Sequence, residues 1–218
     1  VCTRGCGAAA RPEKGWLKRF FPDRLRPVRG RTPVEHSFFT FSFTLKMPAR
    51  FAVIVPMANE EEDFLPFIET LTPVLDHLGN GVVFFVVDKV SKDRTLELCR
   101  ELSQRDHRFV TVWAPENRNV VDAYLRGYKE AVAAGYDLII EMDAGLSHDP
   151  RTLPAFVQAL NQGHECVFGS RFIAGGSIYD SKWQRTALSR VGTVLANLLL
   201  GTRLHDMTSG FQGFQAGI

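Results

Sequence analysis

Two acidic residues, Asp88 and Asp143, each come at the end of an apolar run of the sequence, where a carboxylate can bind a metal ion or a polar ligand. The runs cover residues 82–87 and 138–142, and each has the length and composition of a strand buried in a sheet. In open α/β sheets, ligands bind beyond the carboxyl ends of the strands. A carboxylate placed there can hold a divalent cation and, through the cation, a diphosphate group.

Glu141 precedes Asp143 by two residues, so the two side chains would point to the same side of a strand. Glu141 is therefore a candidate second ligand for a metal ion. Two alternatives stay open on these residues alone. Glu141 could instead pair with a neighbouring basic residue, and residues 143–149 could be only a polar turn that leads into a helix at Pro150.

The elements around these acids alternate between strands and helices. Buried strands are expected at residues 51–56, 82–88, 109–113, 138–143 and 166–170. Apolar residues at helical spacing predict helices between them that end near residues 78, 105, 134 and 162, with Asn59 as the cap of the first. This alternation predicts an α/β fold with a mostly parallel sheet and helices on both faces. Beyond it, the sequence predicts a helix at residues 188–200 and a short returning strand at residues 210–214.

The charge of the chain is unevenly distributed. The net charge is +2, but residues 1–46 hold ten Lys or Arg against three acids, without an apolar period. We expect a disordered basic arm there rather than a segment that binds nucleic acid or a membrane. A natural start at Met47 would make this arm an artefactual extension. Residues 47–218 are expected to form a single domain, truncated at its C-terminus because no finishing element follows.

Several common kinds of site are excluded by motifs that the sequence lacks. No GxGxxG or GxxxxGK[ST] segment is present for a dinucleotide or P-loop site, and no GxSxG elbow for a hydrolase. The four cysteines form no CxxC pair, so reduced thiols are expected. Residues 36–45 are apolar but too short to cross a bilayer.

Five segments, in this order and spacing, together resemble the family 2 glycosyltransferases of the GT-A fold, which is Rossmann-like. Within that family the chain is similar to the polyprenol-phosphate (dolichol-phosphate) mannose synthases, over about residues 51–214. The segments are VIVPMANEE at 53–61, VDKVSKDRT at 87–95, MDAGLSHDP at 142–150, GSRF at 169–172 with a Gly pair at 175–176, and DMTSGF at 206–211.

The resemblance implies a donor pocket with a metal ion at the strand ends. The nucleotide of the donor would be bound by Pro56, Asn59, Glu61, Asp88 and Asp143. Asp143, with Glu141 as the candidate second ligand, would hold Mg²⁺ or Mn²⁺. Gly145 stands where the family has the second Asp of its Asp-x-Asp motif, but one or two protein carboxylates suffice for such an ion.

The resemblance also implies a site for the acceptor phosphate. The residues at matching positions are Arg171, Arg185 and Ser189, and arginine forks suit phosphate oxygens. Asp206 would position groups near the acceptor, so the residues expected to act in catalysis are Asp143, Arg171 and Asp206. The chain departs from the family pattern at two places, which leaves open the nucleobase and the sugar of the donor. Lys89-Val90 replaces the usual Asp-Gly, and residues 117–124 replace a glycine-rich loop.

The expected activity is transfer of a hexosyl group from a nucleotide diphosphate sugar, GDP-mannose or a UDP-sugar, to a polyprenyl phosphate. The reaction would occur in the cytoplasm, at the membrane face, with the apolar helix at residues 188–200 lying along the interface. One alternative is a sugar-hydroxyl acceptor, which would require a general base such as Asp206 or Asp149. Another is a nucleotide-sugar-binding pseudoenzyme, because Gly145 and Lys89 depart from the family pattern.

Overall fold

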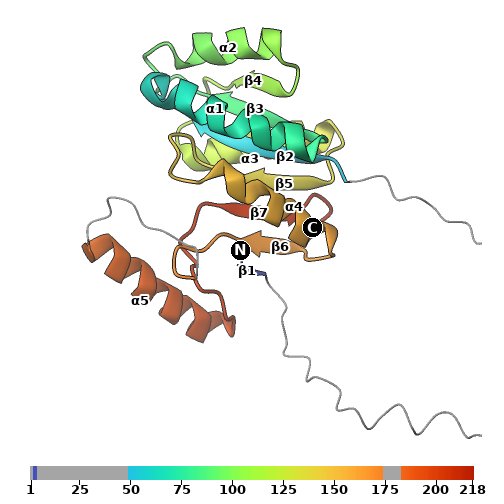
Figure 1. Ribbon diagram of the computed structural model, residues 1–218. Helices are drawn as coiled ribbons and strands as arrows, with labels where there is room; N and C mark the ends of the chain where they lie inside the picture. Colours follow the sequence, from blue (N-terminus) through green and yellow to red (C-terminus); the bar gives the residue numbers. More distant parts are fainter. Residues whose placement is uncertain (1, 4–48, 174–182) are drawn as a thin grey trace, which may run out of the picture. The chain divides into compact units, whose positions relative to one another are not determined.

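The computed structural model of the chain describes residues 2–3, 49–173 and 183–218, which all belong to one compact unit. The predicted basic arm lies outside the described residues apart from Cys2–Thr3, and so does the Gly175–Gly176 pair. Residues 49–173 and 183–218 form the predicted α/β architecture, a sheet with helices on both of its faces (Figure 1).

The sheet has seven strands in the order β1-β6-β7-β5-β2-β3-β4. Strands β2 to β5 pair in parallel, whereas β7 is antiparallel to both β5 and β6 and β1 is antiparallel to β6. All strands except β1 and β7 therefore run in one direction, and the predicted mostly parallel sheet is confirmed. The strands are β1 (Cys2–Thr3), β2 (Phe51–Met57), β3 (Gly81–Val87), β4 (Phe109–Trp113), β5 (Leu138–Glu141), β6 (Cys166–Phe168) and β7 (Gln212–Gln215).

The predicted returning strand is β7, and it lies between β5 and β6 in the sheet. Gly213 makes this insertion possible. A Cβ at Gly213 would lie 3.1 Å from Phe156 and 3.3 Å from Leu160, so the missing side chain leaves room for the helix that covers β7.

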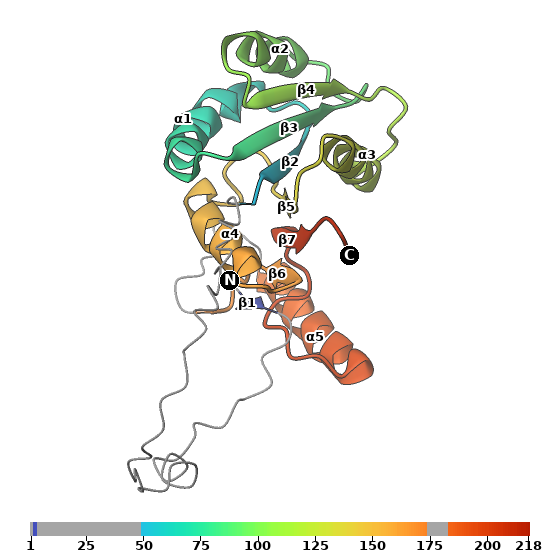
Figure 2. The ribbon, with the colours of Figure 1, turned by 90° about the vertical axis from the view of Figure 1, so that its right-hand side faces the viewer.

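The side chains of the central strands alternate between two cores. Val53, Val55 and Phe85 belong to the core beneath α1, α2 and α4, whereas Ile54 and Phe84 belong to the core beneath α3. Figure 2 shows α1 and α4 on one side of the sheet and α3 on the other. The helices are α1 (Glu61–Leu78), α2 (Thr95–Arg105), α3 (Val120–Ala133), α4 (Leu153–Asn161) and α5 (Trp183–Leu200), with a 3₁₀ turn at Pro150–Thr152.

Two local predictions need correction. Asn59 is not the cap of α1, because the cap residue is Glu60 and Asn59 adopts a left-handed backbone with φ of +59°. Its amide binds the segment after β3 instead, as described below. The last helix starts at Trp183 rather than at Leu188, so it includes polar residues that an apolar period alone does not reveal.

Candidate active site

The carboxyl ends of β2, β3 and β5 meet at one edge of the sheet, as the ends of parallel neighbours must. Met57 ends β2, Asp88 follows β3 directly, and Asp143 lies two residues beyond β5. Met142 still bonds to the sheet, because its N–H donates to the carbonyl oxygen of Ile54 (3.0 Å). Asp143 is thus at the place where open α/β sheets bind their ligands.

Asp143 is held by two neighbouring side chains. The hydroxyl of Tyr124 in α3 donates to Oδ1 of Asp143 (2.7 Å), and the backbone N–H of Asp143 donates to Nδ1 of His148 (3.0 Å). Burial, followed by the charge of Asp143, raises the pKa of Tyr124, so the phenol keeps its proton and stays a donor. Oδ2 of Asp143 lies 3.7 Å from Nε2 of His148, and the Asp143 side chain is 48% exposed, which leaves the carboxylate open to a ligand.

His148 is a packed, neutral ring in this arrangement. Because Nδ1 accepts a hydrogen bond, the proton of the neutral ring is on Nε2, on the side of Asp143. Burial lowers the pKa of His148, Asp143 raises it and Arg171 lowers it, with a net lowering. The ring stacks on Phe211 at 4.9 Å between centroids, and Phe211 stacks on Phe156 at 4.4 Å. His148 is therefore within electrostatic reach of both Asp143 and Arg171.

Glu141 is half-buried and, like Asp143, lies close enough to raise the pKa of the Tyr124 hydroxyl. Burial, followed by repulsion from Asp143, raises the pKa of Glu141 to about 7. In the described part of the chain no basic side chain pairs with Glu141, so nothing there supports the ion-pair alternative. Its role as a metal ligand stays a prediction.

Further acids surround the position where the family motif has its second Asp. A Cβ added at Gly145 would lie 3.3 Å from Oε2 of Glu60 and 3.6 Å from Oδ2 of Asp63, and φ of Gly145 is +71°. Burial, followed by the charges of Asp63, Asp93 and Asp143, raises the pKa of Glu60. Acids from the start of α1 thus border the space that a side chain at position 145 would occupy.

The donor set fits a cation that is bound together with a diphosphate. Among residues 49–173 and 183–218, no three His, Cys, Asp or Glu side chains are grouped so that they could hold a metal ion by themselves. Mg²⁺ and Mn²⁺ in nucleotide sites need only one or two protein carboxylates, since phosphate oxygens and waters complete the shell. Asp143 offers an accessible oxygen for this purpose, and Glu60 borders the open space at Gly145.

Asn59 fastens the segment after β3 to the end of β2. Its Oδ1 accepts from the N–H of Lys92 (2.8 Å), and its Nδ2 donates to the carbonyl oxygen of Val90 (3.4 Å). The backbone N–H of Asn59 also donates to Oγ of Ser91 (3.2 Å). Oδ1 of the buried Asp88 accepts from the N–H of Val90 (2.8 Å), so both predicted donor-binding residues shape the same segment.

The other two predicted donor-binding residues are Pro56 and Glu61, at the end of β2 and the start of α1. Pro56 is half-buried within β2. Glu61 faces α2: its Oε2 accepts from the N–H of Arg94 (3.1 Å), and its own N–H donates to Oδ2 of Asp93 (3.0 Å). The acid of this turn that lies near position 145 is Glu60, which the sequence did not single out because its neighbours are also glutamates.

Arg171, three residues after the end of β6 at Phe168, is held by Asp206. Nε of Arg171 donates to Oδ2 (2.8 Å) and Nη2 to Oδ1 (3.0 Å), while the N–H and hydroxyl of Thr208 donate to Oδ1 at 3.1 and 2.9 Å. The Asp206 side chain is 0% exposed and that of Arg171 is 37% exposed. Burial disfavours the charge of Asp206, but the hydrogen bonds from Arg171 and Thr208 hold its pKa below the ordinary value. Asp206 is thus an ionised anchor for the guanidinium of Arg171.

Two arginines lie near the ring of Phe172: Arg171, and Arg190 from α5. The guanidinium of Arg171 lies 5.4 Å from the ring centroid of Phe172, and that of Arg190 lies 5.0 Å from it. Of the other two predicted acceptor residues, Ser189 is half-buried in α5, and the side chain of Arg185 lies outside the described residues. The sequence did not indicate Arg190, because a lone arginine on a helix looks like any solvated residue.

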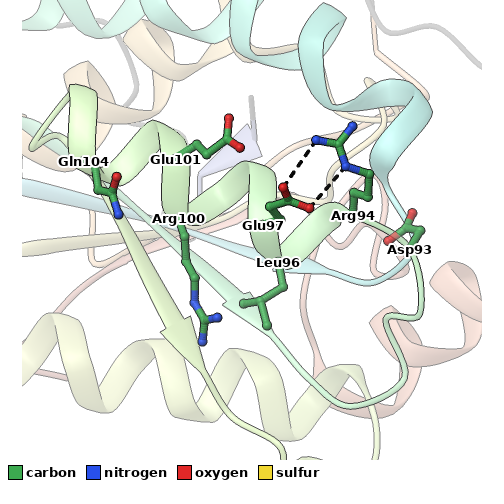
Figure 3. A pocket seen from close by; sticks show the side chains of 7 residues that line it. All are labelled: Asp93, Arg94, Leu96, Glu97, Arg100, Glu101 and Gln104. Atoms are coloured by element: carbon green, nitrogen blue, oxygen red, sulfur yellow. Dashed lines mark hydrogen bonds and ion pairs between the residues drawn. The ribbon is translucent and has the colours of Figure 1, made fainter.

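An open hollow on the outer surface of α2 contains none of the groups at the strand ends. Figure 3 shows that Arg94 and Glu97 in it bond to each other, with Nε of Arg94 3.2 Å from Oε2 of Glu97. We assign no role to this hollow. Its lining residues are Asp93, Arg94, Leu96, Glu97, Arg100, Glu101 and Gln104.

Curated proteins similar to this chain are polyprenyl-phosphate mannosyltransferases. The polyprenol monophosphomannose synthase of Mycolicibacterium smegmatis is 33% identical over 173 residues, which cover 79% of this chain and 64% of that protein. The dolichol-phosphate mannosyltransferase of Pyrococcus furiosus is 29% identical over 76% of this chain and 45% of its own length. The undecaprenyl-phosphate mannosyltransferase of Micrococcus luteus is 29% identical over 77% of this chain and 67% of its own length. The chain therefore spans between about half and two thirds of these relatives.

The fold matches that of a solved GT-A-like enzyme. Glucosyl-3-phosphoglycerate synthase from Mycobacterium tuberculosis, in complex with Mn²⁺, UDP-glucose and phosphoglyceric acid, superposes with a TM-score of 0.55 at 18% identity, over 78% of this chain and 57% of that one. At this identity the likeness concerns the fold alone. The family model for glycosyl transferase family 2 matches residues 52–218, which contain every strand-end acid described above. This chain belongs to glycosyl transferase family 2.

Proposed function

We propose that this chain transfers a hexosyl group from a nucleotide diphosphate sugar, GDP-mannose or a UDP-sugar, to a polyprenyl phosphate. The observation that carries the proposal is that a carboxylate, Asp143, and a guanidinium, Arg171, both lie near the ring of His148. Asp143 offers an accessible carboxylate oxygen to a cation bound with the donor diphosphate, and Arg171 offers a buttressed guanidinium to an anionic acceptor. The names of the relatives agree with a lipid-phosphate acceptor, although the chain spans only part of each.

In the proposed mechanism, the residues at the strand ends bind the sugar donor. Asp143, together with Glu60 or the predicted Glu141, would hold Mg²⁺ or Mn²⁺, which neutralises the departing diphosphate when it is bound. The hydrogen bond from Tyr124 fixes the direction of the Asp143 carboxylate. Asn59 keeps the segment after β3 in place for the nucleoside.

The acceptor half requires binding and orientation but no strong base. A phosphate oxygen is already ionised at neutral pH, so it can attack the anomeric carbon directly. The new bond forms between this oxygen and the anomeric carbon while the bond to the nucleoside diphosphate breaks. Arg171, with Arg185 and Ser189 as predicted partners, would hold the acceptor phosphate in line with the departing group.

The rival with a sugar-hydroxyl acceptor is less well supported, because its two candidate bases are already engaged. Asp206 is buried and bonded to Arg171. Asp149 accepts from the N–H and the Nε of Arg151, both at 2.9 Å, and these bonds hold its pKa below the ordinary value. A carboxylate with a lowered pKa is a poor general base. An acceptor that is already ionised avoids this difficulty.

Helix α5 supports an acceptor that lies in a membrane surface. On one side of the helix, Thr193 Oγ1 accepts from the N–H of Met207 (3.1 Å), and Asn197 Nδ2 donates to the carbonyl oxygen of Leu204 (2.8 Å). No helix of the described chain is long and apolar enough to span a bilayer. An amphipathic helix of this kind can lie in the interface, here at the cytoplasmic face. Its apolar side chains Leu188, Val191, Val194, Leu195, Leu198 and Leu199 are between 54% and 84% exposed.

A transfer assay tests the proposal. Full-length protein is supplied with radiolabelled GDP-mannose, UDP-glucose or another UDP-sugar, polyprenyl phosphate and Mg²⁺ or Mn²⁺, and label that enters butanol is measured. Asp143→Asn should lower the transfer at least about a hundredfold, because it removes a charge at the diphosphate. Glu69→Gln, on the exposed face of α1, is the matched control and should leave the transfer unchanged.

The outcomes separate the proposal from its rivals. Near wild-type transfer by Asp143→Asn would refute the assignment of Asp143. Label that appears only in water-soluble glycosides would favour the hydroxyl acceptor. Calorimetry that detects nucleotide-sugar binding without turnover in either metal would favour the pseudoenzyme. Arg185→Ala should raise the apparent KM for polyprenyl phosphate and change the KM for the donor little.

A further inference from the structure

Two polar side chains of helix α5, Thr193 and Asn197, face the part of the site that contains Arg171. They are four residues apart, so they lie on the same face of the helix. Thr193 is 5% exposed and Asn197 is half-buried, whereas the exposed apolar side chains of α5 named above lie on the opposite face. The contacts of these two residues therefore show how α5 is held to the rest of the protein.

Asn197 holds the segment that follows the helix. Its Nδ2 donates to the carbonyl oxygen of Leu204 (2.8 Å), and its Oδ1 accepts from the N–H of Leu204 (3.0 Å). The same oxygen accepts from the hydroxyl of Thr202 (2.7 Å). Leu204 is 8% exposed, so its backbone groups have little access to water. One side chain thus satisfies both backbone groups of Leu204 and fixes this residue against α5.

Thr193 holds the same segment a second time, three residues later in the chain. Its Oγ1 accepts from the N–H of Met207 (3.1 Å). Asp206 lies between the two attachment points, Leu204 and Met207, and its buried carboxylate accepts the two hydrogen bonds from Arg171 described above. The segment is therefore bound to α5 near both of its ends and to Arg171 between them.

The position of this segment sets the direction of the Arg171 guanidinium. Besides its bonds to Asp206, Nη2 of Arg171 donates to Oγ1 of Thr208 (2.7 Å). A shift of residues 204–208 would therefore move two groups that hold the guanidinium. An arginine fork binds a phosphate in a defined direction, and a misplacement of about 1 Å is enough to weaken such an arrangement.

We propose that Thr193 and Asn197 are positioning residues of the acceptor site, which hold Arg171 in place through residues 204–208. The inference rests on the proposed transfer to a polyprenyl phosphate. Lipid contact on the apolar face of α5 fixes the helix and, through Thr193 and Asn197, the guanidinium that binds the acceptor.

The donor side of the site does not depend on this link. In the described chain, the side-chain hydrogen bonds of Asp143, Asp88 and Asn59 involve no residue of α5. Loss of the link should therefore affect the acceptor and spare the donor.

Steady-state kinetics of the full chain, with polyprenyl phosphate in phosphatidylcholine vesicles, tests the inference. Thr193→Val has nearly the same shape but cannot accept from the N–H of Met207. It should raise the apparent KM for polyprenyl phosphate about threefold to tenfold, as the loss of one hydrogen bond implies, and leave the KM for the donor unchanged. Thr193→Ser keeps the hydroxyl and should restore the wild-type KM. A merely structural role would lower kcat through a smaller folded fraction and leave both KM values unchanged.

Two further variants complete the kinetic test. Asn197→Asp keeps the acceptor oxygen but loses the donor to the carbonyl of Leu204, so it should raise the KM for polyprenyl phosphate in the same way. Thr70→Val is the matched control. The Thr70 hydroxyl donates to the carbonyl oxygen of Pro66 within α1 (2.9 Å), so its removal should leave both KM values unchanged.

Hydrogen exchange measured by mass spectrometry tests the link to lipid without any turnover. In the wild type, phosphatidylcholine vesicles should slow the exchange of the N–H groups of Met207 and Thr208, because a fixed helix holds this segment more firmly. Thr193→Val should bind the vesicles as well as the wild type does, which sedimentation checks, but the slower exchange should be lost. A variant with Leu198→Gln and Leu199→Gln should lose both the binding and the slower exchange.

The failure of the inference is distinct from the failure of the proposed function. If the wild type transfers no sugar to polyprenyl phosphate, the proposed function is overturned and this inference with it. If the wild type transfers sugar and Thr193→Val and Asn197→Asp both keep its KM for the acceptor, the inference alone is overturned. Equal rises in the KM values for donor and acceptor would also overturn it. Vesicles that slow exchange equally in the wild type and Thr193→Val would overturn the link between lipid and Arg171.

Discussion

An aspartate at position 145 should destabilise the unliganded protein, although it would restore the acid that the family motif has there. The left-handed backbone of Gly145, with φ of +71°, costs a residue with a side chain about 1–2 kcal/mol. The new carboxylate would also lie close to Glu60 and Asp63, whose oxygens are 3.3 and 3.6 Å from the added Cβ. Two like charges about 4 Å apart repel by about 1 kcal/mol in water and about 4 kcal/mol at an effective dielectric constant of about 20. Because these side chains are partly or fully exposed, we expect a repulsion near the lower value.

Gly145→Ala separates the two contributions, since it has the backbone cost without the charge. For a domain of this size, 1 kcal/mol lowers the melting temperature by about 2–4 °C. Thermal melts at low salt should therefore place the Ala variant about 2–8 °C below the wild type, and the Asp variant a further 2–4 °C or so lower. The difference between the variants should shrink in about 1 M NaCl, where the screening length is about 3 Å.

The same pair of variants reports on the cation. Mn²⁺ should raise the melting temperature of Gly145→Asp more than that of Gly145→Ala, because only the former adds a carboxylate that the ion can neutralise. The double variant Glu60→Gln with Gly145→Asp should melt above Gly145→Asp alone at low salt. Equal melting temperatures of the Asp and Ala variants at low salt would refute the closeness of Glu60 and Asp63 to position 145. An Ala variant as stable as the wild type would refute the strained backbone.

Three other changes have predictable results. Asp206→Asn should cost about 1–3 kcal/mol at pH 7, because it removes the charge-assisted hydrogen bonds to Arg171, whose guanidinium is 37% exposed and can be partly solvated by water. The pKa of Asp206 is depressed in the folded state, so its contribution to stability is present above the unfolded pKa of about 3.9 and is lost as the pH falls through the folded pKa. The melting temperatures of variant and wild type should therefore converge in acid. A difference in melting temperature that stays constant with pH would contradict this. Burial raises the pKa of the Cys99 thiol to about 12, so a maleimide should not react with it at pH 7 until denaturant is added. Mass spectrometry detects the label, and labelling of Cys99 in the native protein would contradict its burial. Removal of residues 1–46 takes away the two-residue edge strand β1 and should change the melting temperature by only a few degrees, because so short a strand contributes few hydrogen bonds; a large drop would show that the arm packs on the domain.

The positions of the strands and helices could be predicted because they depend on local patterns. Apolar runs marked β3 and β5, and the alternation with helices predicted parallel pairing correctly. The place of β7 could not be predicted in this way. Nothing in the sequence around Gly213 states that it will pair with both Ile140 and Val167, because this choice depends on the packing of α4 against the finished sheet.

The candidate site was predictable where motifs mark it, and not where distant side chains meet. Asp143 was found from its place after an apolar run. Tyr124, which donates to it, looks in the sequence like any core residue of an amphipathic helix. The consecutive glutamates at residues 60–62 likewise hide which of them turns towards position 145, since that depends on where the helix starts. Such contacts arise from tertiary packing, for which a local pattern has no signal.

The place of β7 between β5 and β6 has a consequence for the order in which the protein folds. Strands β2 to β5 can pair among themselves from residues 51–141, with connections of ordinary length. Strand β6 has no neighbour in this group and joins it only through β7, which lies more than 40 residues later in the chain. Closing so long a loop is slow compared with local pairing. The part of the sheet formed by β2 to β5, where we propose that the donor binds, should thus acquire protection from hydrogen exchange before Arg171 and α5 are fixed. The part with β6, β7 and α5, where we propose that the acceptor binds, should be the first to open.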